Sequence, residues 1–301
     1  MQKKVSLSSI YVLATFAMLF WGMSFIWSKI VFKYYSPIAT ITLRLFFSSI
    51  ILYFILYFFY RSYLVLPKGN WKLFLLLTFF EPFLYYIGES FGLQKVDATI
   101  TAVTVSTIPI FNAIVGFYIF RENLTKINIF GIIISFIGIL CMIIKDNFQF
   151  YVSIVGMLWL LLAVLSAVGY GISVKKATMH YHPVYIIFVQ NIIAFFFFLP
   201  IFIIGDLGDV IQTSVTQELV SSLLYLSFFA SSLAFIFHTY VIQQIGIGKA
   251  NVFLNLIPIF TSIASYFLLK ESFTYSKIVG IGLVLAGLYL AQIHRKIQTD
   301  L

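Results

Sequence analysis

The chain has 301 residues, of which 61% are hydrophobic and only 10% are charged, and its mean hydropathy is +1.03. Such residues cannot supply the polar surface of a soluble protein, so a soluble fold is excluded and an integral membrane protein is predicted. The net charge of +9 does not indicate nucleic-acid binding, because Lys and Arg are scattered singly or in pairs between apolar runs, as expected of charges that set membrane topology.

The first apolar run, residues 10–27, follows a short basic start that contains Lys3 and Lys4. Cleaved signal peptides begin in the same way, but no small-residue cleavage site follows here. Trp21, Trp27 and Lys29 occupy the place where that site would be, and more apolar segments come after them. The run is therefore interpreted as the first membrane-spanning helix.

Polar and proline-containing breaks divide the chain into ten apolar segments of about 20 residues, the length that crosses the hydrocarbon core. The segments are 10–32, 37–60, 71–93, 97–120, 126–144, 152–174, 183–205, 218–243, 248–269 and 275–293. Helix is the only suitable state, because lipid offers no partner to unpaired backbone groups and the alternating pattern of a barrel is absent. The prediction is an all-α integral membrane protein with ten transmembrane helices.

A four-residue motif, Ile108-Pro109-Ile110-Phe111, returns 149 residues later as Ile257-Pro258-Ile259-Phe260. Other residue types agree at the same offset: Glu122 with Glu271, Thr125 with Thr274, Gly131 with Gly280, and Gly138 with Gly287. Agreement of such different residues at one fixed spacing indicates a duplicated unit, which divides the chain into residues 1–147 and 148–301.

The basic residues are unequally distributed between the two ends of the segments. Of the 19, twelve lie on the side of the N-terminus, Arg44 lies inside a segment, and six lie on the other side: Lys29, Lys33, Lys95, Lys145, Lys270 and Lys277. Both termini are therefore predicted in the cytoplasm, with the protein in the inner membrane of a bacterium. Five helices per half is an odd number, so the second half crosses the membrane in the opposite sense to the first. Secondary transporters commonly have such inverted repeats, with the substrate site near the midplane between the halves.

The repeated motif also resembles a known family. Each half has a small residue that opens a helix, then Pro, then Glu at a turn, then a Gly-rich helix. These are Ala98, Pro109, Glu122, Gly131 and Gly138, and then Ala250, Pro258, Glu271, Gly280 and Gly287. The pattern, with Phe20-Trp21-Gly22-Met23-Ser24-Phe25 and Tyr170-Gly171-Ile172-Ser173, resembles the EamA-like branch of the drug/metabolite transporter superfamily over residues 10–293. The resemblance implies two inverted five-helix repeats and export or exchange of small metabolites, without naming a substrate.

The third segment carries charged residues that are costly to place in a membrane. Glu81, Tyr85 and Glu89 recur at steps of four and therefore share one helical face. An ionised side chain at mid-bilayer is unfavourable, so each carboxylate requires a reason. We expect a polar stripe on a central cavity, where it binds a cationic or amino group or carries a proton. The alternative is a neutral carboxylic acid hydrogen-bonded between helices.

Two further titratable or charged residues lie inside predicted spans. At the offset of 149, Glu89 corresponds to His238, a candidate for proton coupling or gating, whose alternative role is packing. Arg44 is expected to pair with Glu89, to face a substrate carboxylate, or to snorkel to the outer surface.

Trp21 and Asn255 complete the predicted substrate-binding set, and Pro109 and Pro258 are predicted hinges. Each proline removes a backbone hydrogen bond within a span and so permits a kink that flexes. Glu271, in a short turn, is expected to cap a helix or to pair with Lys270. Small residues are expected to let their helices approach closely: Gly131, Ser135, Gly138, Gly280, Gly282, Ala286 and Gly287.

The sequence contains no H-E-x-x-H, P-loop or G-x-S-x-G motif, and its four histidines are dispersed. We therefore expect no enzyme, no ATP-driven pump, no metal site and no cofactor. The predicted function is secondary active export or exchange of small polar metabolites, by preference amino acids or related zwitterions, by alternating access. The predicted transporter is a monomer or homodimer in the lipid bilayer, with protons as a candidate coupling ion. The alternatives are an importer or exchanger of cationic amines, sugars or nucleotide derivatives, and a non-transporting membrane receptor.

Overall fold

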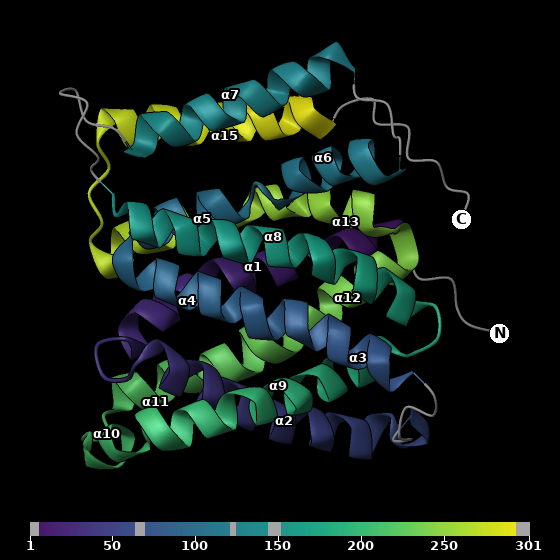
Figure 1. The fold of residues 1–301 in the computed structure, drawn as a ribbon, viewed down its shortest axis with the longest axis vertical. Helices are drawn as coiled ribbons and strands as arrows, with labels where there is room; N and C mark the ends of the chain where they lie inside the picture. The colour runs from purple at the N-terminus through teal and green to yellow at the C-terminus, as the bar shows by residue number, and fades with distance from the viewer. Residues whose placement is uncertain (1–5, 64–69, 121–124, 144–151, 293–301) are drawn as a thin grey trace.

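The computed structural model describes residues 6–63, 70–120, 125–143 and 152–292, and in these ranges the chain forms helices and no strands (Figure 1). The first half consists of α1 (Leu7–Val31), α2 (Pro37–Phe59), η1 (Arg61–Tyr63), α3 (Trp71–Thr78), η2 (Phe79–Leu84), α4 (Tyr85–Lys95), α5 (Ala98–Val105), α6 (Ile108–Phe120) and α7 (Lys126–Ile143). The second half consists of α8 (Ile154–Thr178), α9 (Pro183–Gly205), α10 (Leu207–Gln212), α11 (Gln217–Tyr225), η3 (Leu226–Ala234), α12 (Phe235–Ile245), α13 (Ile247–Val252), η4 (Phe253–Leu256), α14 (Ile257–Ala264), η5 (Ser265–Leu269) and α15 (Tyr275–Gln292).

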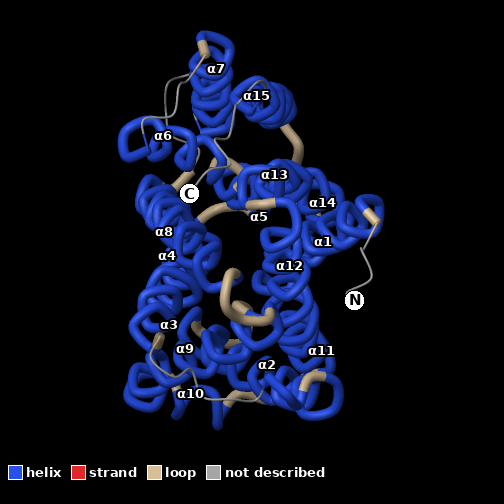
Figure 2. Tube along the Cα trace, turned by 90° about the vertical axis from the view of Figure 1, so that its right-hand side faces the viewer, coloured by secondary structure: helices blue, strands red, loops and turns tan. Residues whose placement is uncertain are grey.

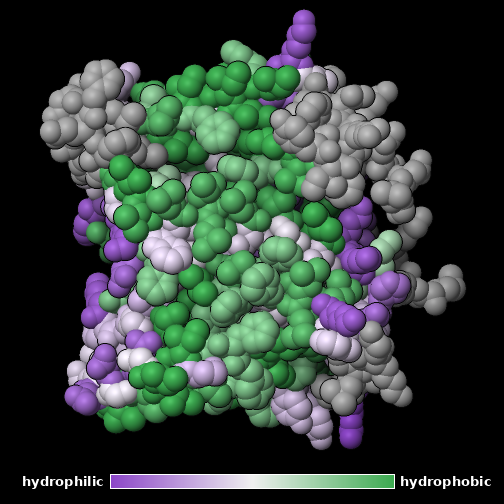
Figure 3. Space-filling view, in the orientation of Figure 1, coloured by the Kyte–Doolittle hydropathy of each residue, from purple (hydrophilic) through white to green (hydrophobic). Residues whose placement is uncertain are grey.

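These helices form ten apolar crossings. Within the described ranges, nine helical stretches are long and apolar enough to span a membrane, and the apolar stretch of α7, Lys126–Met142, is shorter. The predicted all-α membrane fold is confirmed. Figure 3 shows the corresponding surface, a broad hydrophobic band between two edges where hydrophilic side chains gather. The short helix α10 in the acidic loop was not predicted, because six residues are too few for a periodic pattern.

Successive crossings alternate in direction, so α1 begins and α15 ends on the same side of the bundle, at the right of Figure 1. The second half begins with α8 on the opposite side from α1. The predicted boundary between the halves, at residues 147 and 148, lies outside the described residues.

Helix starts follow the local sequence. The Ser36 side chain accepts a hydrogen bond from the backbone N–H of Ala39 at 3.0 Å, and Pro37 occupies the first turn of α2, where it leaves no donor unsatisfied. Pro183 opens α9 in the same way, although His182 makes no capping hydrogen bond there.

Several crossings contain irregular helical stretches. The stretches η2, η3 and η5 have the wider hydrogen bonding of a π-helix, and Glu81 within η2 has an extended backbone, with φ −148° and ψ 122°. The segment 97–120, predicted as one helix, is broken by a turn at Ser106 and Thr107 between α5 and α6. The break has a local cause in Pro109, whose ring lacks the N–H that would continue the helix.

Helices from the two halves pack against each other throughout the bundle. Helix α1 contacts α14, η3 and α12, while α4 packs on α8 and α2 on α9. Gly22 allows the α1–α14 crossing to be close, because a Cβ there would lie 2.9 Å from the Cβ of Phe260. At this crossing the hydroxyl of Thr261 donates to the carbonyl oxygen of Gly22 at 2.9 Å. The main hydrophobic core therefore joins the two halves.

Helices α7 and α15 form a pair at one end of the molecule, set apart from the other helices in Figures 1 and 2. Their glycines face each other: a Cβ at Gly138 would lie 2.7 Å from the carbonyl oxygen of Gly280, and the reverse distance is also 2.7 Å. Ser135 donates a hydrogen bond to the carbonyl oxygen of Val284 at 3.3 Å. The small-residue interface is confirmed for four glycines and Ser135. It is wrong for Gly282 and Ala286, which lie exposed on α15.

Gly287→Leu is expected to separate α7 from α15 and to lower the melting temperature of the purified protein. A Cβ at position 287 would lie 2.5 Å from the carbonyl oxygen of Gly131 and 2.6 Å from the backbone nitrogen of Ser135, and overpacking of this kind costs about 1–3 kcal/mol. Gly282→Leu is the matched control on the same helix, since no atom lies within 4 Å of its Cβ position. Equal melting temperatures for the two variants would contradict the proposed close packing.

Candidate functional site

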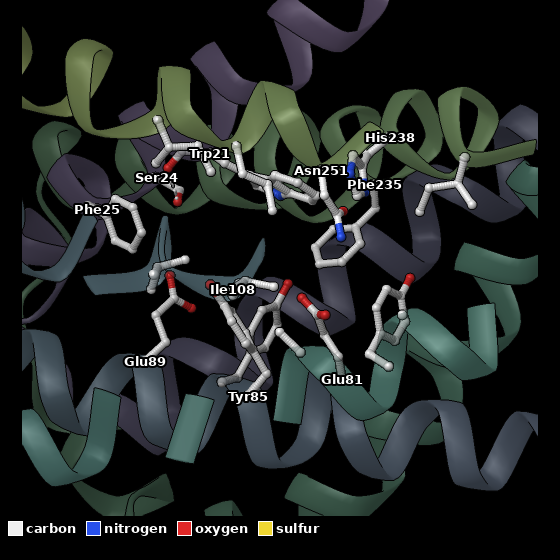
Figure 4. A pocket seen from close by; sticks show the side chains of 18 of the residues that line it. Trp21, Ser24, Phe25, Glu81, Tyr85, Glu89, Ile108, Phe235, His238 and Asn251 are labelled. Carbon is white, nitrogen blue, oxygen red and sulfur yellow. Dashed lines mark hydrogen bonds between the residues drawn. The ribbon is translucent and has the colours of Figure 1, made fainter. Parts of the chain in front are cut away.

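A cavity of about 670 Å³, including the part open to solvent, lies between the two halves of the bundle. Figure 4 shows one wall carrying Glu81, Tyr85 and Glu89 and the facing wall carrying Trp21, His238 and Asn251. Aliphatic and aromatic side chains make up most of the lining, as in most small-molecule sites. The polar or charged lining residues, including Trp and Tyr, are Trp21, Ser24, Arg44, Glu81, Tyr85, Tyr86, Glu89, Tyr170, His238 and Asn251.

The predicted stripe of Glu81, Tyr85 and Glu89 does face the cavity. It runs from η2 into α4, and the four-residue spacing keeps the three side chains on one side despite the extended backbone at Glu81. Both carboxylates are buried, with 7% of Glu81 and 4% of Glu89 exposed, and Oε2 of Glu89 has no hydrogen-bond partner. A buried oxygen without a partner is costly, so this atom is suited to accept a hydrogen bond from a bound solute.

Arg44 is buried beside the same wall and does not extend to the surface. Its Nε donates to the hydroxyl of Ser231 at 2.8 Å, and its guanidinium carbon lies 4.2 Å from the centre of the Tyr86 ring. Snorkelling was therefore the wrong alternative, because hydrogen bonding and stacking hold the side chain inside the protein. No carboxylate of the described residues lies within 4 Å of the guanidinium, so the alternative of a direct ion pair with Glu89 is also wrong. The third alternative, in which Arg44 faces the cavity, agrees with its position in the lining.

His238 lies on the facing wall and is 7% exposed. Its ring packs edge-on against Trp21 with 4.9 Å between ring centres, and its Nε2 has no hydrogen-bond partner in the described part of the chain. The residue therefore both packs and presents an unsatisfied nitrogen. Its sequence counterpart at the offset of 149, Glu89, lines the same cavity.

A polar network behind the cavity holds Arg44 in place. Asn191 donates to the hydroxyl of Ser48 at 2.8 Å and to the carbonyl oxygen of Ser231 at 3.0 Å, and Ser48 and Ser232 share a hydrogen bond of 2.7 Å. These residues come from α2, α9 and η3, so the network joins both halves. The only sequence signal for it was a cluster of Ser and Asn inside apolar segments.

The sequence predicts Asn255 as a substrate-binding residue. The asparagine that lines the cavity is instead Asn251. Asn255 lies in η4 and is directed toward α15, where its Oδ1 accepts a hydrogen bond from Gln292 at 3.4 Å. The two asparagines are four residues apart and share a face of a regular α-helix. The change from α-helix to the tighter 3₁₀ geometry at Phe253 turns Asn255 away from the cavity.

Pro109 and Pro258 occupy equivalent places in the two halves. Each is the second residue of a helix, α6 or α14, directly after an interruption of the crossing. Prolines at this position remove no hydrogen bond from the helix that they begin. Each crossing is therefore irregular just before its proline, and the hinge role of Pro109 and Pro258 stays a prediction.

Comparison with known proteins accounts for this arrangement. The EamA-like transporter family matches the chain twice, over residues 8–144 and 154–292. The chain belongs to the EamA-like transporter family. The resemblance inferred from the repeated motif is thereby confirmed, and the protein is a membrane transporter.

Relatives of this EamA-like transporter carry names of the same kind. An uncharacterized transporter of Archaeoglobus fulgidus is 26% identical over 287 residues, which cover 93% of this chain and 97% of the relative. The uncharacterized transporter YetK of Bacillus subtilis is 24% identical over 291 residues, which cover 95% and 87%. A solved structure described as "Crystal structure of protein" matches with a TM-score of 0.67 at 12% identity and covers 95% of this chain and 97% of that one, which supports the fold alone.

An ion cluster with two buried members, Lys277 and Glu271, and a half-exposed one, Asp97, joins the two halves of the transporter on the side opposite to the start of α1. Lys277 of α15 lies 3.0 Å from Oδ2 of Asp97 and 3.2 Å from Oε2 of Glu271. Glu271 also accepts hydrogen bonds from the backbone N–H of Ala98 and the hydroxyl of Thr99, both at 2.7 Å. The predicted capping role of Glu271 is thus correct, but it caps α5 of the other half and pairs with Lys277 and not Lys270.

Glu271→Ala is expected to destabilise the folded transporter by roughly 2–4 kcal/mol, because Lys277 would keep only the half-exposed Asp97 as its ion-pair partner and α5 would lose its cap. Thermal unfolding in detergent measures this effect. Glu218→Ala is the control: Glu218 makes a 3.3 Å ion pair with Lys33, but both side chains are about half exposed, so little change is expected. A melting temperature of Glu271→Ala equal to that of the control would contradict the buried role.

Proposed function

We propose that this protein is a secondary active transporter that moves amino acids or related zwitterions outward by alternating access. One observation carries the proposal: groups of opposite charge, the guanidinium of Arg44 and the carboxyl groups of Glu81 and Glu89, line one cavity between the halves without pairing directly with each other. The carboxylate of a zwitterion can bind Arg44, and its ammonium group can bind Glu81 or Glu89. Charge-assisted hydrogen bonds of this kind are among the strongest in proteins.

The surrounding rings would fix the orientation of the solute. Trp21 packs edge-on against Phe235 at 5.0 Å as well as against His238, and this aromatic surface can cover an apolar side chain. Asn251 projects into the cavity in Figure 4 and can donate or accept a hydrogen bond. The site therefore combines two charged ends with an apolar middle, which suits small amphoteric solutes.

Movement of the two halves would expose this cavity to each side in turn. The interruptions before Pro109 and Pro258 are the proposed hinges, since they are places where a crossing can bend without breaking a regular helix. Opposite orientation of the halves, as in an inverted repeat, would make the two open states mirror one another. The ion cluster of Asp97, Glu271 and Lys277 would close one of the two paths.

Protons are the proposed coupling ion. An unpaired ionised carboxylate in a low-dielectric site is unfavourable, so the empty cavity favours protonated carboxyl groups and the occupied cavity favours ammonium–carboxylate pairs. Substrate and protons would then compete for Glu81 and Glu89. This competition is sufficient to couple export of the solute to entry of protons.

Glu81→Gln and Glu89→Gln are each expected to reduce amino-acid counterflow in proteoliposomes roughly 10- to 100-fold, the loss that corresponds to one hydrogen bond to a charged group. The dependence of the remaining transport on pH is expected to flatten. Glu218→Gln, outside the cavity on α11, is the control and should transport as the wild type does. Wild-type rates and an unchanged pH profile in both cavity variants would refute the site.

The proposed location is the inner membrane of a bacterium, with both termini in the cytoplasm. It rests on the greater number of basic residues on the side where α1 begins and α15 ends. Alkaline phosphatase fused to the C-terminus is expected to be inactive, whereas the same enzyme inserted after Ser214, between α10 and α11, is expected to be active. The reverse pattern of activity would overturn this topology.

A further inference from the structure

We propose that the cavity is specific for amino acids whose side chain carries a second cation, with lysine as the simplest case. This inference rests on the proposed function and narrows its substrate class. Arg44 would hold the carboxylate group, and Glu81 and Glu89 would each hold one ammonium group.

The charges of the cavity lining carry the first part of the argument. Its charged side chains are two carboxylates and one guanidinium, and the one histidine, His238, is buried against Trp21. A neutral amino acid, with one ammonium and one carboxylate group, would leave one of the two acidic side chains unmatched. A solute with two cations and one carboxylate matches all three charged side chains. Matching matters here because an unpaired charge in a low-dielectric site is strongly unfavourable.

The spacing of the two carboxylates gives the second part. Glu81 and Glu89 are eight residues apart in the chain, and in Figure 4 they lie on either side of Tyr85. The wall therefore offers two separate carboxylates, each of which can bind one ammonium group. Both side chains nevertheless project from the same wall into the same cavity (Figure 4). An aliphatic chain with a cation at each end can reach both, with a hydrogen bond at either end.

The surface between the two carboxylates suits the aliphatic part of such a solute. Tyr85 lies between them on the stripe, and Phe235 and Trp21 face it across the cavity (Figure 4). Aromatic faces pack well against methylene groups, and they also attract ammonium groups through cation–π interactions. A lysine molecule likewise has an aliphatic chain with a charged group at each end.

Arg44 supplies the site for the carboxylate. Its guanidinium lies over the ring of Tyr86, and the side chain lines the same cavity as the stripe. Within the described residues only its Nε is hydrogen-bonded, to Ser231, so the two terminal nitrogens retain their donors. Terminal guanidinium nitrogens bind carboxylates in a two-pronged geometry that a lysine side chain cannot supply.

Calorimetric titration of the purified full-length protein with three solutes tests this assignment. Lysine has all three charges, norleucine lacks the side-chain ammonium group, and cadaverine lacks the carboxylate. Lysine is expected to bind at least 10-fold more tightly than either of the others. If lysine binds no better than norleucine, the basic side chain is not recognised and the inference is overturned. If cadaverine equals lysine, Arg44 does not hold a carboxylate, and the inference is overturned as well.

Two variants locate the ammonium sites. Glu81→Gln and Glu89→Gln are each expected to weaken lysine binding, and at least one of them is expected to lose the preference for lysine over norleucine. A melting temperature close to that of the wild type shows that each variant is folded. Glu218→Gln should keep the wild-type preference. If both cavity variants keep that preference, the pairing of each carboxylate with one ammonium group is wrong.

The test separates this inference from the proposed function. Counterflow of neutral amino acids without a preference for lysine would overturn the inference and leave amino-acid transport standing. Absence of counterflow with any amino acid, lysine included, would refute the proposed function itself.

Discussion

Charged groups inside an apolar bundle need partners, and this requirement organises the centre of the molecule. Arg44 satisfies it through Ser231 and the face of Tyr86, and Ser231 in turn is bound by Asn191. Glu89 is left with an unpartnered oxygen directed at the cavity. The protein thus supplies the partners of the Arg44 guanidinium, whereas the partner of the Glu89 carboxylate must be a solute or a proton. This difference is the physical basis for reading the cavity as a binding site.

The backbone obeys a similar requirement. In a membrane, irregular helical geometry is tolerated where it is covered by protein or lines a cavity. Two of the irregular stretches line the cavity: η2 contributes Glu81 and η4 contributes Leu254. The extended backbone at Glu81 and the interruptions before Pro109 and Pro258 therefore lie close to the site. The regular helices around them act as a frame.

Contacts between the two halves differ in character from place to place. Helices α7 and α15 meet through glycine backbones at one end of the molecule, a contact with little freedom to slide. The cluster of Asp97, Glu271 and Lys277 is held by directional bonds that can break and reform. The cavity itself is bounded by side chains from both halves with space between them. The interface between the halves of this EamA-like transporter thus combines a closely packed helix pair, an ion cluster and a cavity.

The sequence by itself determined the class of the protein, because hydrophobicity and helical length are summed over many residues and tolerate local exceptions. It also determined the stripe of Glu81, Tyr85 and Glu89, since a four-residue period survives a local distortion of the helix. The repeat at an offset of 149 identified the glycines of α7 and α15. Each glycine of α7 has a glycine counterpart on α15, and equivalent helices of two related halves can pack through the same positions. These features depend on spacing within one helix or on symmetry between two.

Only the tertiary structure decided which of several equivalent positions meet. Asn251 lines the cavity and Asn255 does not, because a change to 3₁₀ geometry rotates the helix between them. Arg44 turns inward because Ser231 and Tyr86, 187 and 42 residues away in the chain, receive it. Glu271 binds Lys277 and caps α5 of the other half, a choice over Lys270 that no local pattern specifies. Each of these outcomes depends on contacts between distant segments, and the free energy of such a contact cannot be assigned until folding has brought its two sides together.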